Sequence, residues 1–263
     1  MLQLEVSPGY LVYFHECIWS VAFFLNPLLP HLPNRFCVDL GAADGQNGSN
    51  TFLLFLNGWL GLAIEREARY FQAMQRTYRE LGLQIALQNS EITPDNIPLL
   101  LATENVPSEF AFLSLDIDSC DYWVLKQLLA YYRPIVICTE INETIPPPLR
   151  FTLLPEAKPH APSHFFGYSL SLLHDLAKIY HYDLVRLDFN NAFLVAREYN
   201  FFWPALSAEE AYLSYRKNPR PDYNQDMEKL LSWPAAQNQD FLNQHFAAYA
   251  AEYTLYTSKK EIP

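Results

Sequence analysis

The sequence predicts an α/β fold with a doubly wound and mostly parallel sheet. Apolar runs of strand length alternate with longer amphipathic patterns between residues 36 and 196. Strands that are separated by helices need crossover connections, which make neighbouring strands parallel and cover both faces of the sheet. With 263 residues and 50% hydrophobic composition, the chain can bury one large core with additional segments.

Seven strands and four helices are expected in this region. The strands are predicted at 36–40, 61–64, 84–87, 110–116, 135–140, 183–187 and 192–196, and the helices at 49–57, 68–81, 122–132 and 169–180. Only residues 188–191 join the last two strands. Because this connection is too short for a crossover, these strands should form an antiparallel hairpin. The prediction is a Rossmann-like, seven-stranded sheet in which only the last strand is antiparallel.

Two segments flank the predicted core at residues 34–198. The N-terminal segment 1–33 contains an apolar stretch at 18–29 that includes one proline and is too short to span a bilayer. We expect it to form a helix packed on the core or over the mouth of a pocket. A loop broken by prolines is expected at 144–162.

The C-terminal extension, residues 199–263, is rich in aromatic side chains. Helical spacing predicts helices at 208–215 and 240–256. Three alternatives stay open for these helices: packing on the core, a lid over an apolar substrate, or the surface of a homodimer.

The net charge and the cysteine content limit the kinds of partner and of cell compartment that are expected. The formal net charge is -11 at pH 7, which argues against nucleic acid and against an anionic membrane surface. The four cysteines lie far apart, so neither a disulfide framework nor a zinc cluster is indicated, and a reducing compartment is expected. The N-terminus lacks a basic start and a clear cleavage site. A cytoplasmic protein with a small-molecule substrate is therefore expected.

Acidic residues and glycines at the strand ends indicate a nucleoside ligand. Asp39 and Glu65 stand at the ends of two predicted parallel strands, where doubly wound sheets bind ligands, and an acid there can accept both hydroxyls of a ribose. Gly41 and Gly45 would let the backbone turn sharply. A dinucleotide fingerprint needs glycines at 43 and 46, where this chain has alanine and glutamine, and Asp44 would repel a pyrophosphate. A cationic, phosphate-free ligand such as S-adenosylmethionine (SAM) suits these residues.

The segment V-D-L-G-A-A-D-G at 38–45 resembles motif I of the class I SAM-dependent methyltransferases, with Ala43 in place of the middle glycine. Four further blocks are similar to the FkbM-like branch of these enzymes, and the matched region covers residues 34 to 197. These blocks are Gly48-Ser-Asn-Thr51, Leu113-Ser-Leu-Asp-Ile-Asp118 followed by Asp121-Tyr-Trp123, Phe166-Gly-Tyr-Ser-Leu170 and Asn191-Ala-Phe-Leu-Val195. Five blocks in order are a far more specific signal than one glycine loop.

The resemblance implies roles in cofactor binding. Asp39 and Gly41 would shape the methionine side of the pocket, Glu65 would hold the ribose, and Asn89 would lie near the adenine. The remaining residues expected at the cofactor are Ala42, Asp44, Gly45, Ser49, Asn50, Arg66 and Asp116. Two alternatives stay open: Ser49 and Asn50 could instead cap the first helix, and Asp44 could instead stabilise a turn.

Four oxygen-bearing side chains follow the fourth and fifth strands. In an alternating strand Asp116 and Asp118 point to one side, as do Glu140 and Asn142. Such ligands suit Mg²⁺. The set resembles the Asp, Asp, Asn site of the catechol and macrolide-sugar O-methyltransferases, with Glu140 where those enzymes carry Asp. In the alternative without a metal, Asp118 and Asp121 cap the next helix while Asp116 binds the cofactor amine.

Two histidines are candidates for a general base. His160 and His164 lie in the loop between the fifth strand and the next helix, which in this fold covers the substrate, and a histidine can accept a proton near pH 7. The alternative is that both are ordinary surface histidines, and His174 and His181 are expected to be structural. With Asp116, His160 and His164 complete the predicted catalytic set.

These observations predict a SAM-dependent methyltransferase that methylates a hydroxyl of a small or medium natural product or sugar, with Mg²⁺ as an assisting ion. The alternatives are an N-methyltransferase, a non-catalytic SAM-binding or carbohydrate-recognition protein of the same fold, and an enzyme that uses the metal for another reaction.

Overall fold

The computed structural model describes residues 18–217 and 222–257. The described chain forms two compact units. The first contains the described residues up to Ile117, together with Val124–Thr139 and Val195–Phe201, and the second contains the remainder. Residues 1–17 of the predicted N-terminal segment and 258–263 of the predicted C-terminal extension lie outside the described residues.

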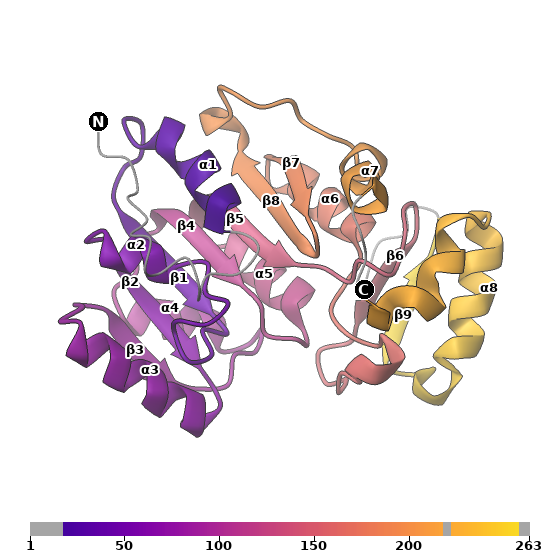
Figure 1. The fold of residues 1–263 in the computed structure, drawn as a ribbon, viewed down its shortest axis with the longest axis horizontal. Helices are drawn as coiled ribbons and strands as arrows, with labels where there is room; N and C mark the ends of the chain where they lie inside the picture. The colour runs from indigo at the N-terminus through magenta and orange to yellow at the C-terminus, as the bar shows by residue number, and fades with distance from the viewer. Residues whose placement is uncertain (1–17, 218–221, 258–263) are drawn as a thin grey trace. The chain divides into compact units, whose positions relative to one another are not determined.

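The first unit contains a parallel sheet that matches the predicted strands closely (Figure 1). β1 (Phe36–Leu40) pairs with β2 (Leu60–Glu65) on one side and with β4 (Glu109–Leu115) on the other, and all of these pairings are parallel. β3 (Ala86–Asn89) adds to β2, two residues later than predicted. β5 (Arg133–Glu140) pairs with β4. Nearly every side chain of β1, β4 and β5 is buried, which accounts for their continuous apolar runs.

Five helices accompany these strands: α1 (Ile18–Leu28), α2 (Phe52–Leu56), α3 (Ala68–Glu80), α4 (Ile97–Thr103) and α5 (Asp121–Leu129). The first fulfils the expectation of a helix in the apolar stretch at 18–29. The sequence did not predict α4, because Pro98 interrupts its apolar run. Pro98 occupies the first turn of α4, where the missing backbone N–H costs nothing.

The seven-stranded sheet has the order β3-β2-β1-β4-β5-β8-β7. β7 (Tyr182–Asp188) and β8 (Asn191–Ala196) are joined by two residues and form the expected hairpin (Figure 1). The last strand in the chain order of this sheet is antiparallel, which confirms the predicted fold. α6 (Leu170–Ile179) precedes this hairpin, and α7 (Ala208–Lys217) packs against β7 and α6.

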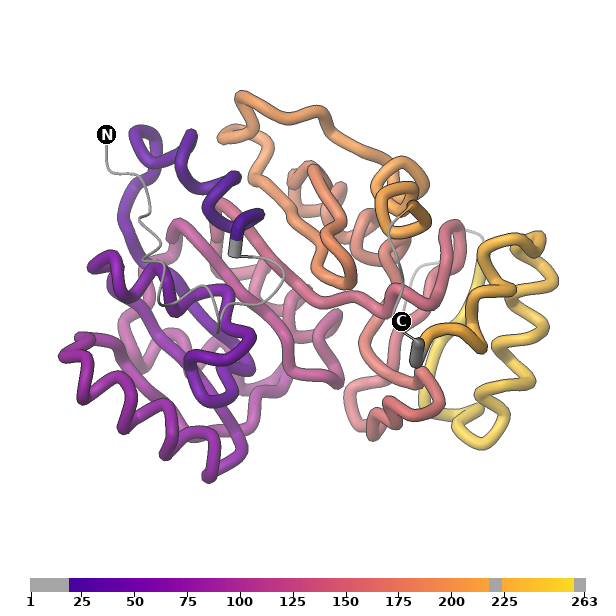
Figure 2. The backbone as a smooth tube through the Cα atoms, viewed as in Figure 1, coloured from indigo at the N-terminus to yellow at the C-terminus, as the bar shows by residue number. Residues whose placement is uncertain are grey.

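The second unit also contains a small sheet that the sequence did not predict. β6 (Arg150–Leu153) lies within the expected loop and pairs antiparallel with β9 (Tyr253–Tyr256). Figure 2 shows the end of the described chain returning to β6. The prediction of a helix over 240–256 is therefore wrong at its C-terminal end, since α8 (Ala235–His245) stops before β9. The alternating Tyr-Thr-Leu-Tyr of β9 suits a strand, but only the partner strand reveals this.

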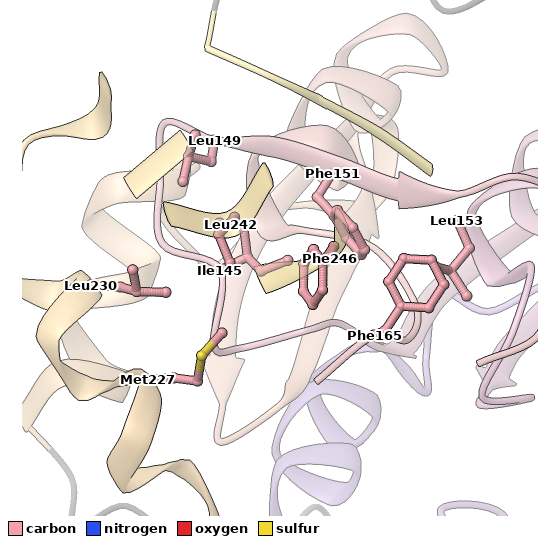
Figure 3. Close-up of a cluster of buried hydrophobic side chains, with 9 residues drawn as sticks. All are labelled: Ile145, Leu149, Phe151, Leu153, Phe165, Met227, Leu230, Leu242 and Phe246. Carbon is pink, nitrogen blue, oxygen red and sulfur yellow. The ribbon is translucent and has the colours of Figure 1, made fainter. Parts of the chain in front are cut away.

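Aromatic and aliphatic side chains of the C-terminal extension pack in a cluster within this second unit. Figure 3 shows Phe246 of the extension close to Phe151 and Phe165, and the ring centroids of Phe151 and Phe246 are 5.5 Å apart. The other members of the cluster are Ile145, Leu149, Leu153, Met227, Leu230 and Leu242. The extension also contains the short 3-10 helices η3 (Asp222–Leu231) and η4 (Ala247–Tyr249). Of two further 3-10 helices, η1 (Ala161–Ser163) lies before the extension and η2 (Arg197–Tyr199) ends at its first residue.

Within the described ranges, no helix is both long enough and apolar enough to cross a membrane.

Candidate functional site

The predicted cofactor residues gather at one edge of the sheet in the first unit. Leu40, the last residue of β1, pairs with Ile64 of β2 and with Leu115 of β4. Glu65 pairs with Asn89, the last residue of β3. The carboxyl ends of β1, β2, β3 and β4 therefore meet at the same edge, as expected for the ligand-binding edge of a doubly wound sheet.

The loop after β1 depends on Gly41. Its φ is +88°, and a Cβ atom there would lie 1.7 Å from the backbone oxygen of Asp116, which no side chain permits. The backbone amides of Gly41 and of buried Ala42 both donate to the oxygen of Ile64, at 3.0 Å each. This glycine thus lets the end of β1 approach the backbone that follows β4.

Gly45 closes the same loop against helix α3. Its φ is +74°, and a Cβ atom would lie 2.5 Å from Cγ of Met74 and 2.9 Å from Cε1 of Tyr78. The hydroxyl of Tyr78 donates to the oxygen of Gly45 at 2.9 Å. Both glycines that the sequence singled out are therefore required by the packing.

Ala43 replaces the middle glycine of the family pattern and still adopts a left-handed backbone, with φ of +47°. Its amide donates to Oε2 of Glu65 at 2.9 Å, while the amide of Glu67 donates to Oε1 at 2.6 Å. Glu65 is 7% exposed. Its carboxylate thereby joins the loop after β1 to the end of β2.

Asp39 lies below this loop and is buried. Thr51 donates its hydroxyl to Oδ2 of Asp39 at 2.5 Å, and Oγ of Ser49 lies 3.4 Å from the same oxygen. Burial raises the pKa of Asp39 from its ordinary value of 3.8 to about 6, although hydrogen bonds from Thr51, Ser114 and Ser49 act in the opposite direction. The structure gives Asp39 an internal set of partners beneath the loop.

The alternatives for Asp44 and Ser49 can be compared with their contacts. Oδ1 of Asp44 accepts from the amides of Gln46 and Asn47, at 3.0 and 2.8 Å, which is a turn-stabilising arrangement. Oγ of Ser49 accepts from the amide of Phe52 at 3.0 Å, at the start of α2. These contacts fit the turn and capping roles.

Three further residues of the cofactor set are less buried. Asn50 is half-buried, and its Nδ2 lies 3.5 Å from Oγ of Ser114. Asn89 is exposed, and its Nδ2 donates to the backbone oxygens of Glu65 and Arg66 at 2.7 and 2.9 Å. The exposed side chain of Arg66 lies 3.9 Å from Glu67. Asn89 thereby fixes the backbone that follows β2.

The acidic side chains predicted to hold a metal follow β4 and β5. Asp116 is exposed, comes directly after β4 in the first unit, and donates its amide to the oxygen of Leu40 at 2.9 Å. Asp118 and Glu140 belong to the second unit, and ligand oxygens of these two side chains lie within 4.8 Å of each other. Asn190 donates its Nδ2 to Oε1 of Glu140 at 2.6 Å. Such a pair of carboxylates offers the oxygen ligands that Mg²⁺ prefers.

Asp118 and Asp121 were also expected as caps of α5. Oδ2 of Asp121 accepts from the amide of Ser119 at 2.8 Å, and Asp121 is the first residue of α5. Asp118 has a left-handed backbone, with φ of +59°. This contact reaches an amide that precedes α5, so it is not the N-cap hydrogen bond that the alternative without a metal expects.

The sequence predicted that Asn142 points to the same side of the fifth strand as Glu140, but Asn142 lies beyond the end of that strand. β5 ends at Glu140, so the alternation that would align the two side chains does not continue to residue 142. Asn142 is fully buried. Its Oδ1 accepts from the amide and the hydroxyl of Thr144, at 3.2 and 2.6 Å. Because an amide oxygen has two lone pairs, these contacts occupy its capacity as an acceptor.

The two candidate histidines differ in exposure. His164 is 5% exposed, and its Nε2 lies 3.0 Å from Oδ1 of Asp226. His160 is exposed, and its Nδ1 lies 2.8 Å from Oγ of Ser163. Ser163 donates its hydroxyl proton to the backbone oxygen of His160 at 3.0 Å. The alternative of a surface position therefore describes His160 but not His164.

The solved structures described below are distant likenesses of this chain. No protein-family model matches the sequence, and no curated protein does. A SAM-dependent methyltransferase from Clostridium acetobutylicum is 10% identical, over 69% of this chain and 92% of that chain, with a TM-score of 0.43. The N-terminal domain of EvdMO1 with S-adenosylhomocysteine bound is 12% identical, over 73% and 85%, with a TM-score of 0.47. Magnesium protoporphyrin IX methyltransferase from Synechocystis, also with S-adenosylhomocysteine, is 12% identical, over 67% and 81%, with a TM-score of 0.43.

Sequence reasoning missed the residues that hold the candidate side chains in place. Thr51 appeared only as part of a similar block, yet its hydroxyl donates to buried Asp39 at 2.5 Å. Thr144 and Asp226, the partners of Asn142 and His164, carried no signal at all. Hydroxyl and carboxylate residues in loops are too common to be singled out without their spatial neighbours.

Proposed function

We propose that this chain is a SAM-dependent methyltransferase that methylates a hydroxyl group of a small or medium natural product or sugar. The observation that carries the proposal is the ligand-binding edge of the first unit. There, glycine turns bring backbone amides to the ends of β1 and β4, and Glu65 stands at the end of β2. Residues 41–50 contain no lysine or arginine, which disfavours a phosphate and suits a cationic cofactor.

Glu65 retains the capacity to bind the ribose. A carboxylate offers about four acceptor sites, and the amides of Ala43 and Glu67 use one on each oxygen. Two sites are left for the two ribose hydroxyls. These amides also restrict the rotation of the carboxylate, so less conformational entropy is lost when the ribose binds.

Asp39 supports the cofactor pocket indirectly in this proposal. Because its carboxylate is buried against Thr51 and Ser49, it holds the loop from below, and Gly41 and Ala42 present the backbone to the methionine part of the cofactor. Asn89 uses its Nδ2 on the backbone of Glu65 and Arg66, which leaves Oδ1 as an acceptor for the adenine amino group.

Methyl transfer requires little covalent chemistry from the protein. A bond forms between the acceptor oxygen and the methyl carbon while the bond between that carbon and the sulfonium sulfur breaks, and the products are the methyl ether and S-adenosylhomocysteine. The hydroxyl proton must leave to a base. The residues therefore act by alignment and by accepting this proton.

His160 is the better placed of the two candidate bases. In the proposed tautomer the hydroxyl proton of Ser163 goes to the backbone oxygen of His160, and Oγ of Ser163 accepts from Nδ1–H. That arrangement leaves the lone pair on Nε2 of an exposed imidazole, ready to accept a proton. Nε2 of buried His164 is already engaged with Asp226.

Asp118 and Glu140 of the second unit would hold the assisting Mg²⁺, and Asp116 stays a ligand predicted from the sequence alone. The oxygen-only donor set fits this ion. A bound divalent cation lowers the pKa of a coordinated hydroxyl and orients it. Asn190, which donates to Oε1 of Glu140, would restrict that carboxylate to one orientation.

Calorimetry with SAM and S-adenosylhomocysteine tests the proposal. We expect the wild type to bind both. Glu65→Ala should weaken binding by at least about 100-fold, since the two hydrogen bonds from the ribose to this charged group contribute about 1.5–3 kcal/mol each. Glu67→Ala is the matched control, because this neighbouring exposed acid offers only its backbone amide to the site, and it should change affinity less than twofold.

Two other results decide separate parts of the proposal. Absence of binding by the wild type at millimolar SAM would overturn the assignment as a methyltransferase. A dissociation constant for Mg²⁺ that is unchanged in Asp118→Asn with Glu140→Gln would remove only the metal. SAM binding without turnover of any hydroxyl or amine acceptor would favour a ligand-binding protein of the same fold.

A further inference from the structure

The amide side chain of Asn142 crosses from the end of β5 to the loop that carries both candidate histidines. Its Nδ2 donates to the backbone oxygens of His164 and Phe166, at 2.8 and 3.0 Å. Its backbone amide donates to the oxygen of Tyr168 at 2.8 Å. All of these residues belong to the second unit. One buried side chain therefore fixes two carbonyl groups on the C-terminal side of the loop.

The hydrogen-bond partners of this amide fix which of its two ends is the nitrogen and which is the oxygen. Its nitrogen faces two carbonyl oxygens, which can only accept, and its oxygen faces the amide of Thr144, which can only donate. A flipped amide would place oxygen against two oxygens. The hydroxyl of Thr144 adds a second donor to Oδ1 at 2.6 Å. Every hydrogen-bonding site of the amide is therefore used inside the protein.

This geometry excludes Asn142 from the metal set that the family resemblance implied. A metal ligand needs an available lone pair on Oδ1, and ligation would break two hydrogen bonds of a side chain with no exposed surface. A buried polar group that loses its partner destabilises the folded state, so ligation by Asn142 is unfavourable. Asp118 and Glu140, exposed and half-buried respectively, meet no such obstacle.

We infer that Asn142 is a positioning residue that holds the loop 160–166, and that it is not a metal ligand. The loop is closed at its base, where the amides of His160 and Phe165 exchange hydrogen bonds with each other's carbonyl groups at 2.7 and 3.2 Å. Asn142 anchors that closed loop to the end of β5. This inference rests on the proposed function only where it treats a histidine of the loop as the candidate base. The anchoring of the loop by Asn142 does not depend on the proposed function.

The substitution Asn142→Asp separates the two roles because they predict opposite outcomes. As a metal ligand, an aspartate would strengthen Mg²⁺ binding by adding charge. As an anchor, it would place a carboxylate against the oxygens of His164 and Phe166, lose both donated hydrogen bonds, and release the loop. The side chains are of nearly equal size, so packing changes little.

Hydrogen exchange and Mg²⁺ titration of the full chain form the test. For Asn142→Asp we expect amide exchange in residues 160–166 to become at least tenfold faster, with a dissociation constant for Mg²⁺ within twofold of the wild type. The Nε2 proton of His164, assigned through its loss in Asp226→Asn, should also lose its hydrogen-bonded NMR signal in Asn142→Asp. A role limited to overall stability would leave that signal in place.

Asn238→Asp is the matched control. Asn238 is 3% exposed in the same unit and also donates its Nδ2 to two carbonyl groups, those of Leu230 and Trp233, at 2.8 and 3.4 Å. This variant should speed exchange near residues 230–233 and leave the loop 160–166 within twofold. Asp118→Asn should weaken the binding of Mg²⁺ without changing the amide exchange of the loop 160–166.

A milder pair of variants keeps the test valid if Asn142→Asp does not fold. Thr144→Val removes the hydroxyl that donates to Oδ1 of Asn142, and Thr144→Ser retains it. Exchange of the loop should rise at least threefold in the first and stay within twofold in the second.

Loop exchange within twofold of the wild type in Asn142→Asp would overturn the inference, and tighter Mg²⁺ binding by fivefold or more would show a ligand instead. Absence of SAM binding by the wild type would refute the proposed function and leave these exchange results unaffected.

Discussion

The buried carboxyl group of Asp39 should make the stability of the protein depend on pH. Burial raises its pKa from 3.8 to about 6 in the folded chain, a shift of about 2 units that corresponds to about 3 kcal/mol. Because the folded state binds the proton more tightly than the unfolded state, the stabilisation is complete below pH 3.8 and is lost as pH rises through 6. About 2 kcal/mol of the change should fall between pH 4 and pH 7.5.

Asp39→Asn isolates this effect. Asparagine keeps an oxygen that can accept from Thr51, but it does not titrate in this range. Urea denaturation of both proteins at pH 4, 5, 6 and 7.5 gives the difference in their free energies of unfolding, in which the contributions of all other titrating groups cancel. Asp39→Asn should become more stable relative to the wild type by about 2 kcal/mol across this range.

Thr51→Val provides an independent check on the cause. The hydroxyl of Thr51 stabilises the charged form of Asp39 and therefore lowers the pKa of that carboxyl group. Removing the hydroxyl should raise this pKa, so the loss of stability should occur at a higher pH than in the wild type.

The reasoning would be refuted if the difference in the free energy of unfolding between wild type and Asp39→Asn changed by less than about 0.5 kcal/mol from pH 4 to pH 7.5. A carboxyl group that stays solvated contributes no such dependence on pH.

Two further predictions concern stability at constant pH, both measured by urea denaturation. Ala43→Gly should raise the free energy of unfolding by about 0.5–1 kcal/mol. Glycine adopts φ of +47° without steric cost, and its larger loss of entropy on folding offsets part of this gain. A less stable variant would contradict the prediction. Phe246→Ala should lower it by about 3–5 kcal/mol, since Phe246 is fully buried between Phe151 and Phe165; an effect no larger than that of Phe241→Ala, which is half-buried, would count against the cluster.

The sheet could be predicted from sequence because its signals are local. β1, β2, β4, β5 and β8 are apolar runs, and the two-residue connection before Asn191 fixes the hairpin. The pair β6 and β9 could not be predicted in the same way. Each strand has only four residues, and their pairing joins Arg150 to Tyr256, so neither is recognisable without the other.

The candidate site was predictable only as far as strand ends determine it. The register of β1 and β2 places Gly41 and Glu65 at one edge, as the sequence indicated. Asn142 was misplaced because the alternation of β5 was extended two residues past its end at Glu140. The partners Thr51 and Asp226 depend on contacts across many residues, which spacing along the chain does not encode.

The end of β1 and the loop that follows it contain several unfavourable features in a short stretch. Asp39 is a buried acid, Gly41 is held where no side chain fits, and Ala43 has a left-handed backbone that costs an L-residue about 1–2 kcal/mol. A sequence selected for stability alone would relieve at least Ala43 with a glycine. Such strain persists where a function depends on it, since it holds the amides and the Glu65 carboxylate in one arrangement before a ligand arrives. The strand ends around Glu65 therefore carry a strong argument for a binding site.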